Sequence, residues 1–357
     1  MHIDFDYFFA QIEERKSSQL QGRATVVCVY SGRTEDSGVV STANYLARQY
    51  GVRSGMPITL AQKRLQGQKS VFLPADYALY QKVSNRVMTI IQRYGNAFEQ
   101  TSIDEAFIEV TAMVENNIEK AVNLAKKIKS EIMEKEKLTC SIGIGPNKLI
   151  AKIASNYEKP DGLTAISERA VKDFISKLSV GKIPGVGRKT QLRLKDLGVS
   201  TIGDLTLINN ERLVTVFGKK IGAYLYQASR GYDDRPVIDR REPKQISRIR
   251  TLPEDTLDQE KIIKTIEDIS QKIKKHLIEK GYAYQSIGLI AILDDLSVHS
   301  KSLTLEKPTS RIEDIFTYAT RLLEELIQNL PREIRRIGVR ISKLIKLEKQ
   351  ESIENYL

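Results

Sequence analysis

The spacing of hydrophobic and polar residues divides the chain into a mixed N-terminal part, a helical middle and a mixed C-terminal part. Short apolar runs bounded by polar residues predict buried strands. These strands cover 1–5, 24–30 and 138–144. Apolar residues at helical spacing, such as Val83, Val87 and Ile91, predict an amphipathic helix over 76–94. Further helices are predicted over 8–16, 41–50, 115–136 and 148–157.

Residues 165–230 differ from the preceding segments, because short helical runs alternate with glycines, and this pattern predicts a small all-helical domain. Residues 231–244 are dense in charge and lack apolar periodicity, which predicts an interdomain linker. Strand, helix, strand, strand, helix and strand are then predicted over 246–251, 257–280, 284–293, 297–305, 310–329 and 334–341. This β-α-β-β-α-β order predicts a split βαβ sheet with both helices on one face. A tail begins at residue 342.

Composition and charge limit the class of protein. A chain of 357 residues exceeds one ordinary core and predicts about two to four domains. With 56 Lys and Arg against 45 Asp and Glu, the net charge of +11 favours a polyanionic partner such as nucleic acid, although a protein that is merely basic also fits. Two cysteines cannot form a disulfide framework, and apolar runs fall short of the ~20 residues that span a bilayer. We therefore exclude secreted and integral-membrane classes and expect a cytoplasmic protein.

Three acidic residues stand where predicted strands end or turn. Asp4 ends the first strand, and Asp104 and Glu105 lie between two apolar segments that predict a hairpin. Neighbouring strands could bring the carboxylates together, and their repulsion would favour divalent cations such as Mg²⁺, which prefers oxygen ligands. Asp6 is an alternative ligand because it shares a strand face with Asp4, but it is also well placed to cap the next helix. Acidic residues are also common at turns that bind no metal.

Four motifs occur in order along the chain. They are Asp4–Ala10, Thr42–Arg48, Ser102–Ala106 and Lys159–Gly162. Together with the helical segment and the last β-α-β-β-α-β segment, they resemble the Y-family DNA polymerases, most closely the archaeal members of the DNA polymerase IV branch, over essentially the whole chain. The resemblance implies an α+β, multidomain right-hand polymerase with a ferredoxin-like palm, small fingers, a helix-hairpin-helix thumb and a β-α-β-β-α-β little finger. Relatives usually carry a few more apolar residues before the first aspartate.

The same resemblance implies domain boundaries and a reaction. The palm comprises 1–15 and 75–164, the fingers 16–74, the thumb 165–230, the linker 231–244, the little finger 245–341 and the tail 342–357. The implied enzyme is a low-fidelity translesion DNA polymerase, a monomer that transfers deoxynucleotides to a primer 3′-end on a DNA template with two Mg²⁺ per active site. These domains leave no residues for a proofreading exonuclease. The alternatives are a nucleotide cyclase that shares only the palm and a non-catalytic DNA-binding scaffold.

Site residues are implied by the matching motif positions. Asp4, Asp104 and Glu105 match the catalytic, metal-binding carboxylates, and the Phe5 carbonyl matches a backbone ligand. Residues that match the nucleotide contacts are Phe8, Phe9, Thr42, Tyr45, Arg48 and Lys159, and Phe9 matches the ring that excludes ribose. Tyr45 and Arg48 are three residues apart on a predicted helix, so both can reach one side. The alternatives are surface Arg and Lys side chains without partners and an ordinary core aromatic at Phe9.

Two regions indicate contact with DNA. Gly185 and Gly187 lie in a sequence typical of a helix-hairpin-helix element, where backbone N–H groups can meet phosphates, although a tight helix connection would also need glycines. Basic residues cluster near the first and last strands of the last domain: Arg240, Arg241, Arg248, Arg250, Arg335, Arg336 and Arg340. We expect two outer strands to present one positive face to the duplex, unless the charge only protects an edge strand.

The last eight residues resemble the sliding-clamp-binding peptide of archaeal and eukaryotic replication proteins. The matching residues are Gln350, Ile353, Tyr356 and Leu357, of which Leu357 departs from the usual second aromatic. One helical turn from Ile353 would bring Tyr356 and Leu357 to the same side and form an apolar plug. The resemblance implies a sliding clamp as a further partner. The alternative is a frayed terminus that packs nowhere.

Overall fold

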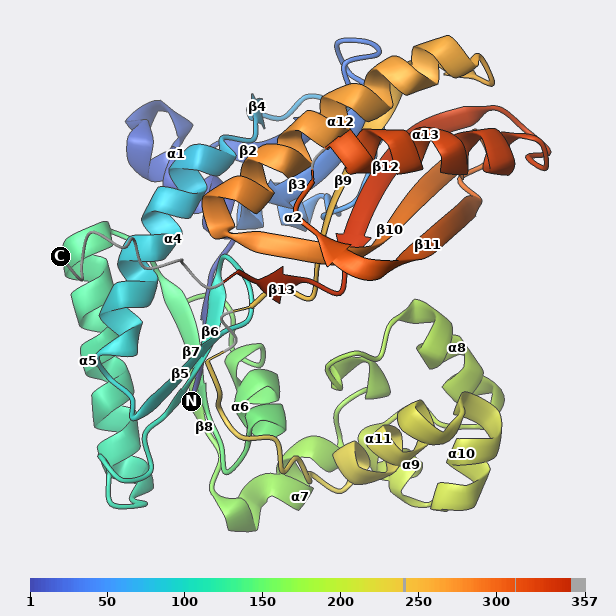
Figure 1. Ribbon diagram of the computed structural model, residues 1–357. Helices are drawn as coiled ribbons and strands as arrows, with labels where there is room; N and C mark the ends of the chain where they lie inside the picture. The colour runs from blue at the N-terminus through green and yellow to red at the C-terminus, as the bar shows by residue number, and fades with distance from the viewer. Residues whose placement is uncertain (240–241, 312, 348–357) are drawn as a thin grey trace, which may run out of the picture. The chain divides into compact units, whose positions relative to one another are not determined.

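The computed structural model describes residues 1–239, 242–311 and 313–347 (Figure 1). The chain forms two compact units, one of Met1–Val29 with Val39–Arg240 and the other of Tyr30–Gly38 with Arg241–Leu357. No helix within the described residues is long and apolar enough to cross a membrane.

The main sheet of the first unit has the order β5-β6-β1-β7-β8. Its strands are β1 (His2–Phe5), β5 (Ala97–Gln100), β6 (Glu105–Glu109), β7 (Cys140–Ile144) and β8 (Leu163–Ala165). The central strand β1 is antiparallel to both of its neighbours, with Asp4 opposite Glu105 on β6 and Ser141 on β7. The predicted hairpin is present as the antiparallel pair β5 and β6. The sheet therefore places the start of the chain beside Glu105.

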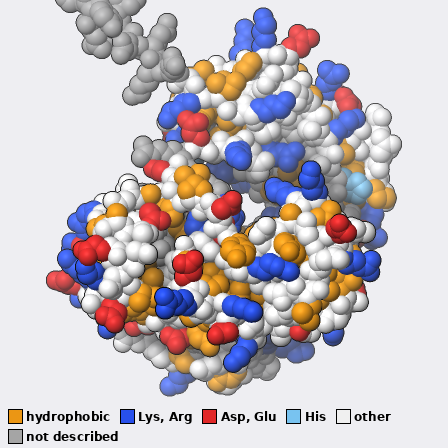
Figure 2. Space-filling model, turned by 90° about the horizontal axis from the view of Figure 1, so that it is seen from below, with side chains coloured by type: hydrophobic (Ala, Val, Ile, Leu, Met, Phe, Trp, Pro, Cys, Tyr) orange, Lys and Arg blue, Asp and Glu red, His pale blue; other side chains and the backbone are white. Residues whose placement is uncertain are grey.

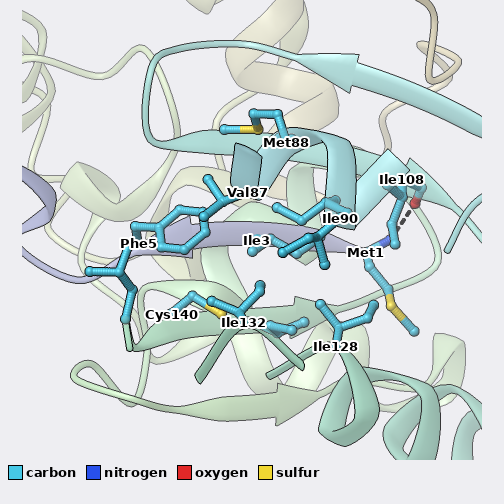
Figure 3. Packing of buried hydrophobic residues seen from close by; sticks show 14 of the residues in the cluster. Met1, Ile3, Phe5, Val87, Met88, Ile90, Ile108, Ile128, Ile132 and Cys140 are labelled. Carbon is cyan, nitrogen blue, oxygen red and sulfur yellow. Dashed lines mark hydrogen bonds between the residues drawn. The ribbon is translucent and has the colours of Figure 1, made fainter. Parts of the chain in front are cut away.

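Helices cover the two faces of this sheet differently (Figure 1). The helices α1 (Phe8–Lys16), α4 (Tyr77–Gln92) and α5 (Ile118–Glu136) contribute to one apolar core, in which Ile3 and Phe5 of β1 are almost fully buried. Figure 3 shows Ile3 and Phe5 among side chains of α4 and α5, such as Val87 and Ile132. Since successive side chains of a strand point to opposite faces, His2 and Asp4 face the other side.

Helix α6 (Lys148–Ser155) packs on that other side, against β1, β7 and β8. Gly143 of β7 makes the close approach possible, because a Cβ atom there would lie 2.0 Å from the Ala151 carbonyl oxygen. Asn147 caps the helix by accepting a hydrogen bond from the Ile150 N–H at 3.0 Å. The close packing brings the polar side of α6 over His2 and Glu105.

A smaller sheet with the order β3-β2-β4 lies in the segment that follows α1. Its strands are β2 (Ala24–Tyr30), β3 (Gly38–Ala43) and β4 (Ser70–Pro74), and its helices are α2 (Tyr45–Gln49), α3 (Ile58–Arg64) and the short η1 (Ser18–Leu20). The prediction of a helix over 41–50 was wrong at its start. Residues up to Ala43 belong to β3, and α2 begins only after Asn44, whose side chain accepts a hydrogen bond from the Ala47 N–H at 3.0 Å.

The glycine-rich segment is all-helical after β8, as predicted. It contains η2 (Glu168–Ala170), α7 (Val171–Ser176), η3 (Val180–Lys182), α8 (Arg188–Asp196), α9 (Ile202–Thr206), α10 (Asn210–Phe217) and α11 (Lys219–Ser229). These helices share a core that includes Leu194, Leu205 and Leu213. Leu149 and Ile153 of α6 join the same core, so α6 connects the main sheet to the helical segment.

The second unit has a four-stranded antiparallel sheet of order β11-β10-β12-β9, with a short added strand. Its elements are β9 (Gln245–Thr256), α12 (Gln259–Lys280), β10 (Tyr282–Leu293), β11 (Val298–Thr309), α13 (Glu313–Ile327), β12 (Ile334–Ser342) and β13 (Ile345–Lys346). The split βαβ prediction is confirmed, because β12 lies between β9 and β10 and both helices cover one face (Figure 1). The predicted tail differs at its start, since β13 pairs with Tyr282 and Ala283.

Candidate active site

The three predicted carboxylates come from two neighbouring strands. Asp4 lies opposite Glu105 in the β1–β6 register, and Asp104 directly precedes β6. The Phe5 N–H donates to the Asp104 carbonyl oxygen at 3.0 Å, which fixes the turn beside the end of β1. Over the part of the chain that the structure describes, however, no three His, Cys, Asp or Glu side chains are grouped closely enough to hold a metal ion. The carboxylates are neighbours in the fold without being assembled into a metal site.

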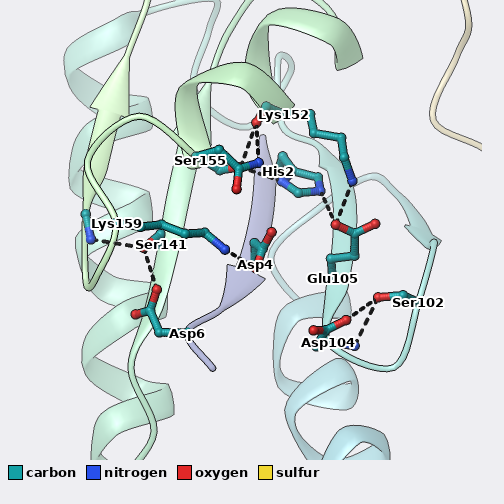
Figure 4. A network of polar contacts seen from close by, with 12 residues as sticks. His2, Asp4, Asp6, Ser102, Asp104, Glu105, Ser141, Lys152, Ser155 and Lys159 are labelled. Atoms are coloured by element: carbon teal, nitrogen blue, oxygen red, sulfur yellow. Dashed lines mark hydrogen bonds and ion pairs between the residues drawn. The ribbon is translucent and has the colours of Figure 1, made fainter. Parts of the chain in front are cut away.

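Each carboxylate is held by a different partner (Figure 4). The Lys159 ammonium group contacts Asp4 Oδ1. The Ser102 hydroxyl donates to Asp104 Oδ1 at 2.5 Å. Glu105 has two partners, because Thr101 Oγ1 donates to Oε1 at 3.0 Å and Lys152 Nζ donates to Oε2 at 2.6 Å. Two lysines therefore supply the positive charge next to these acids.

The electrostatics of the site favour a divalent cation. Burial raises the pKa of Asp4 to about 6, against the opposing effect of Lys159, and the nearby Asp104 and Glu105 raise it further. Burial also tends to raise the pKa of Glu105, but the nearby His2 ring and the hydrogen bond from Lys152 outweigh it and hold this pKa well below its usual range. Carboxylate oxygens on neighbouring strands and the Phe5 carbonyl are the kind of hard ligands that Mg²⁺ prefers. The donor set thus fits the metal that the sequence implied.

His2 is a site residue that the sequence analysis missed. The ring is fully buried, its Nδ1 lies 2.7 Å from Ser155 Oγ, and its Nε2 lies 3.5 Å from Glu105 Oε2. Among the described residues Nε2 has no hydrogen-bond partner. Burial is the main cause that lowers the pKa of His2 to about 4, so the ring is neutral at pH 7. The alternation of β1 could have indicated this residue, since it places His2 on the same face as Asp4.

Asp6 does not have the role that its sequence position indicated. Helix α1 begins after Tyr7, which occupies the N-cap with a left-handed backbone (φ 35°), and β1 already ends at Phe5. Asp6 is fully buried and accepts hydrogen bonds from Ser141 Oγ at 2.8 Å, Thr139 Oγ1 at 2.9 Å and the Asp161 N–H at 2.8 Å. Its oxygens are thus occupied, and the bond to Asp161 fixes the loop that carries Lys159.

A cavity of about 210 Å³ lies beside Asp4 and Asp104, whereas Glu105 does not line it. It is lined by Asp4, Phe5, Tyr7, Phe8, Phe9, Ser41, Thr42, Arg48, Ser54, Asp104 and Lys159. The structure therefore brings most of the expected nucleotide-binding residues to one cavity. Tyr7, Ser41 and Ser54 are additions. Tyr7 lies within the Asp4–Ala10 motif, whereas Ser41 and Ser54 reach the cavity because the segment of the smaller sheet packs beside β1.

The Phe9 ring is fixed by other aromatic rings. It stacks on Tyr80 with centroids 4.3 Å apart and planes at 14°, and it meets Tyr77 edge-on at 5.9 Å. The Tyr80 hydroxyl donates to Glu13 Oε1 at 2.7 Å, which locks the supporting ring. Phe9 is therefore a rigid surface at one side of the cavity.

Tyr45 and Arg48 lie together on α2, as their spacing predicted. The Arg48 guanidinium carbon is 5.0 Å from the centre of the Tyr45 ring, and Arg48 Nε donates to the Ala43 carbonyl oxygen at 2.8 Å. Burial raises the pKa of Tyr45 to about 12, so its hydroxyl remains a donor. That hydroxyl is buried, and the described part of the chain offers it no partner. The remaining N–H groups of Arg48 can serve an anion in the cavity.

Gly185 and Gly187 expose backbone before α8. Gly185 has a φ of +85°, and no described atom lies within 4 Å of a Cβ built on either glycine. Gly187 is the N-cap of α8, so N–H groups of the first helical turn are available to an anion. This geometry suits contact with a phosphate backbone without reading the base sequence.

The basic residues of the second unit do not share one face. Strand β12 is an inner strand, and only β9 of the two basic strands is an outer one. Arg248 and Arg250 lie opposite the buried Val339 and Ile337, hence on the helix-covered face, where Arg250 contacts Asp268 of α12 at 2.5 Å. The expectation of one positive face on two outer strands was therefore wrong.

Arginines of β12 point to the open face or pair with acids. Arg336 and Arg340 lie opposite Thr251 and Ser247, away from the helices. Arg335 contacts Asp255 at 2.7 Å, and Asp255 also accepts from Arg33 at 2.6 Å. Figure 2 shows Lys and Arg side chains spread over one face of the molecule, with acidic side chains between them. Arg240, Arg241, Gln350, Ile353, Tyr356 and Leu357 lie outside the described residues.

Three comparisons with known proteins agree on one family. The model of the impB/mucB/samB family matches residues 3–156, that of its C-terminal domain matches 243–355, and that of the DNA polymerase-iota thumb domain matches 181–233. The DNA polymerase IV of Nitrosopumilus maritimus is 42% identical over 99% of this chain and 98% of its own. That of Saccharolobus solfataricus is 38% identical over 96% of this chain and 95% of its own. A solved Y-family polymerase chimera of Dbh and Dpo4 is similar with a TM-score of 0.91 and 37% identity, over 97% of this chain and 99% of that one.

The fold, the carboxylates beside a cavity and these matches define a right-hand polymerase with a ferredoxin-like palm, small fingers, a helix-hairpin-helix thumb and a little finger. The chain belongs to the impB/mucB/samB family of Y-family DNA polymerases, in its DNA polymerase IV branch. It is thus a DNA-directed DNA polymerase of the translesion class.

Proposed function

We propose that Asp4, Asp104 and Glu105 form the catalytic centre of this polymerase and that the adjacent cavity receives the deoxynucleoside triphosphate. The observation that carries the proposal is the β1–β6 register, which sets Asp4 against Glu105 while Asp4 and Asp104 line the same cavity as Arg48 and Lys159. Acids for a metal and cations for a triphosphate are thereby adjacent. A nucleotidyl transfer needs acids that hold metal ions at the reacting phosphorus and cations that bind the rest of the triphosphate.

The residues at the cavity have separate roles in this proposal. Asp4, Asp104, Glu105 and the Phe5 carbonyl would hold two Mg²⁺, which supply Lewis acidity to the primer hydroxyl and charge neutralisation to the triphosphate. Arg48 and Lys159 bind and orient the triphosphate oxygens, and the Tyr45 hydroxyl and Thr42 assist them. The Phe9 ring lies beneath the sugar and leaves no room for a 2′-hydroxyl. Because Lys159 contacts Asp4 in this structure, it exchanges a carboxylate for a phosphate when the nucleotide arrives.

DNA binding is assigned to the other domains. We assign the palm to 1–15 and 75–164, the fingers to 16–74, the thumb to 165–230, the linker to 231–244 and the little finger to 245–341. The exposed backbone at Gly185 and Gly187 would meet one strand of the duplex. The open face of the little finger would meet phosphates through Arg336 and Arg340.

Two further proposals concern the setting of the enzyme. Residues 342–357 include the tail in which Gln350, Ile353, Tyr356 and Leu357 would bind a sliding clamp. Removing 350–357 should abolish stimulation by the clamp and leave clamp-free extension unchanged; full stimulation of the shortened enzyme would place the clamp contact elsewhere. The substrates, chromosomal DNA and deoxynucleotides, are those of the cytoplasm of a prokaryotic cell, where we propose that the enzyme acts as a monomer.

Primer extension with Mg²⁺ and all four deoxynucleotides tests the catalytic assignment. Asp104→Ala should lower the rate by on the order of a thousandfold, because it removes a metal ligand. It should leave primer–template affinity nearly unchanged, since affinity resides in Lys, Arg and backbone contacts. Glu267→Ala, at an exposed position of α12, is the matched control and should keep full activity.

The same assay separates the alternatives. A scaffold would bind primer–template but would not extend it, and a cyclase would release a cyclic nucleotide in the absence of DNA. Primer extension by Asp104→Ala at the wild-type rate would show that the catalytic carboxylates are other residues.

A further inference from the structure

Lys152 is a cation at the carboxylate site for which the proposed reaction has no use. Its Nζ lies 2.6 Å from Glu105 Oε2, and its side chain is 27% exposed. Figure 4 shows the Glu105 side chain pointing toward Lys152 and His2, whereas the Asp104 carboxylate points toward Ser102. The two carboxylates that should share a metal are thus turned toward different partners.

The position of Lys152 is built into the fold. Gly143 lets α6 approach β7 so closely that a Cβ atom would lie 2.0 Å from the Ala151 carbonyl oxygen and 2.3 Å from the Ser155 N–H nitrogen. Ser155, which takes part in this contact, and Lys152, which follows Ala151, are therefore fixed above β1. Ser155 Oγ also donates to the Lys152 carbonyl oxygen at 3.0 Å and lies 2.7 Å from His2 Nδ1. The helix, the histidine and the lysine form one supported group.

This group converges on a single oxygen atom. Lys152 Nζ donates to Glu105 Oε2, and His2 Nε2 lies 3.5 Å from the same atom. Thr101 holds the other oxygen, Oε1, at 3.0 Å. Both oxygens of Glu105 are thus occupied, and the three acids are not grouped as a metal site within the described residues. An ammonium group 2.6 Å from Oε2 opposes the binding of a metal ion to the same atom, because the two positive charges repel each other.

We propose that Lys152 is a positioning residue that holds Glu105 apart from Asp4 and Asp104 in the metal-free enzyme, and that metal binding requires Lys152 to release it. Lys152 then acts as a competitor of the cation, so its removal should tighten metal binding. A residue that merely supports the shape of the site would have the opposite effect when removed. The inference rests on the proposed metal site.

Binding of Mn²⁺ alone to the full-length protein, without DNA or nucleotide, provides the test. Electron paramagnetic resonance of the free ion gives the dissociation constant without turnover. Lys152→Met should bind Mn²⁺ three- to tenfold more tightly than the wild type. Lys152→Arg keeps the charge and a donor for Oε2, so it should bind within twofold of the wild type. Lys275→Met, an exposed lysine of α12, controls for net charge and should change nothing.

A second comparison separates release of Glu105 from simple loss of a positive charge. In the E105Q background the ion pair is already absent, so adding Lys152→Met should gain less than twofold. Unchanged or weaker Mn²⁺ binding by Lys152→Met, or an equal gain in the E105Q background, would overturn the proposal. A separate result would show that the proposed metal site is wrong. In that case Asp104→Ala would bind Mn²⁺ as tightly as the wild type. Thermal unfolding of each variant confirms that it is folded.

Discussion

The two faces of the palm sheet differ in what they bury, although the same strand contributes to both. Ile3 and Phe5 of β1 pack into the apolar core under α4 and α5, whereas His2 and Asp4 face α6 among ion pairs and hydrogen bonds. Strand alternation places the two sets on opposite sides within four residues. The comparison teaches that one short strand can carry stability on one face and chemistry on the other. Substitutions on the two faces should therefore have different consequences.

The largest effect on stability and activity should come from Gly143, the residue that lets α6 pack on the sheet face that carries His2 and Asp4. Gly143→Ala inserts a methyl group where the Ala151 carbonyl oxygen would be 2.0 Å away, so α6 must shift. Overpacking of this severity should lower the free energy of unfolding by about 3 kcal/mol or more. Because α6 packs on β1 and reaches Glu105, a shift of about 1 Å passed on to these carboxylates should also slow primer extension by on the order of a hundredfold. Urea unfolding and single-turnover extension measure the two effects.

Gly187→Ala is the matched control for stability. Its φ is −85°, and no described atom lies within 4 Å of the added methyl group. We expect its unfolding free energy to fall by at most about 1 kcal/mol, the typical cost of alanine at an N-cap. If Gly143→Ala were as stable as Gly187→Ala, the close packing of α6 would not determine the geometry of this face.

The local sequence pattern correctly predicted helices and strands whose formation depends mainly on their own residues. The runs Phe8–Lys16 and Ala24–Tyr30 form α1 and β2 with the predicted bounds. The pattern failed where pairing with a distant strand decides the outcome. Residues 41–43 look helical but pair with β2, and residues 345–346 belong to a strand only because they pair with Tyr282 and Ala283.

The candidate site was predictable where a motif carries the chemistry and unpredictable where the fold assembles it. Asp4, Arg48 and Lys159 lie in motifs and line one cavity. His2 and Lys152 are single polar residues, 150 positions apart, that meet only because Gly143 admits α6. The face on which Arg248 and Arg340 lie depends on strand register, which charge clustering does not reveal.

An intermediate effect, on the choice between ribose and deoxyribose, should come from Phe9, which packs against the apolar core and also lines the cavity. Phe9→Ala should raise ribonucleotide incorporation relative to deoxynucleotide incorporation by on the order of a hundredfold, because the ring that would clash with a 2′-hydroxyl is lost. Competition between the two nucleotides at one template base measures this ratio. Phe98→Ala removes another partly buried ring of the same core, outside the cavity, and should leave the ratio unchanged. Equal ratios in the two variants would make Phe9 a core residue only.

The smallest effect concerns the stability of the metal-free protein and its dependence on pH. Burial raises the pKa of Asp4 from 3.8 to about 6, so the folded state binds this proton more tightly than the unfolded state. The stability contributed by Asp4 is therefore fully present below about pH 4 and is lost as pH rises through 6. Asp4→Asn removes this loss and should raise the unfolding free energy at pH 7.5 by about 1–3 kcal/mol, given ~1.4 kcal/mol per pKa unit. On the face toward α6, a substitution that removes a catalytic carboxylate would then stabilise the protein. On the apolar face toward α4 and α5, substitutions of buried residues would destabilise it.

The difference between variant and wild type isolates Asp4, because other carboxylates titrate equally in both proteins. Urea unfolding in the presence of a chelator should give a difference near zero at pH 4 that grows between pH 5 and 7. Glu267→Gln, at an exposed position of α12, should show no such trend. Saturating Mg²⁺ should stabilise the wild type more than Asp4→Asn, because only the wild type retains all three carboxylates. A difference that is independent of pH would mean that Asp4 is ionised in the folded protein throughout, and that Lys159 already compensates its burial.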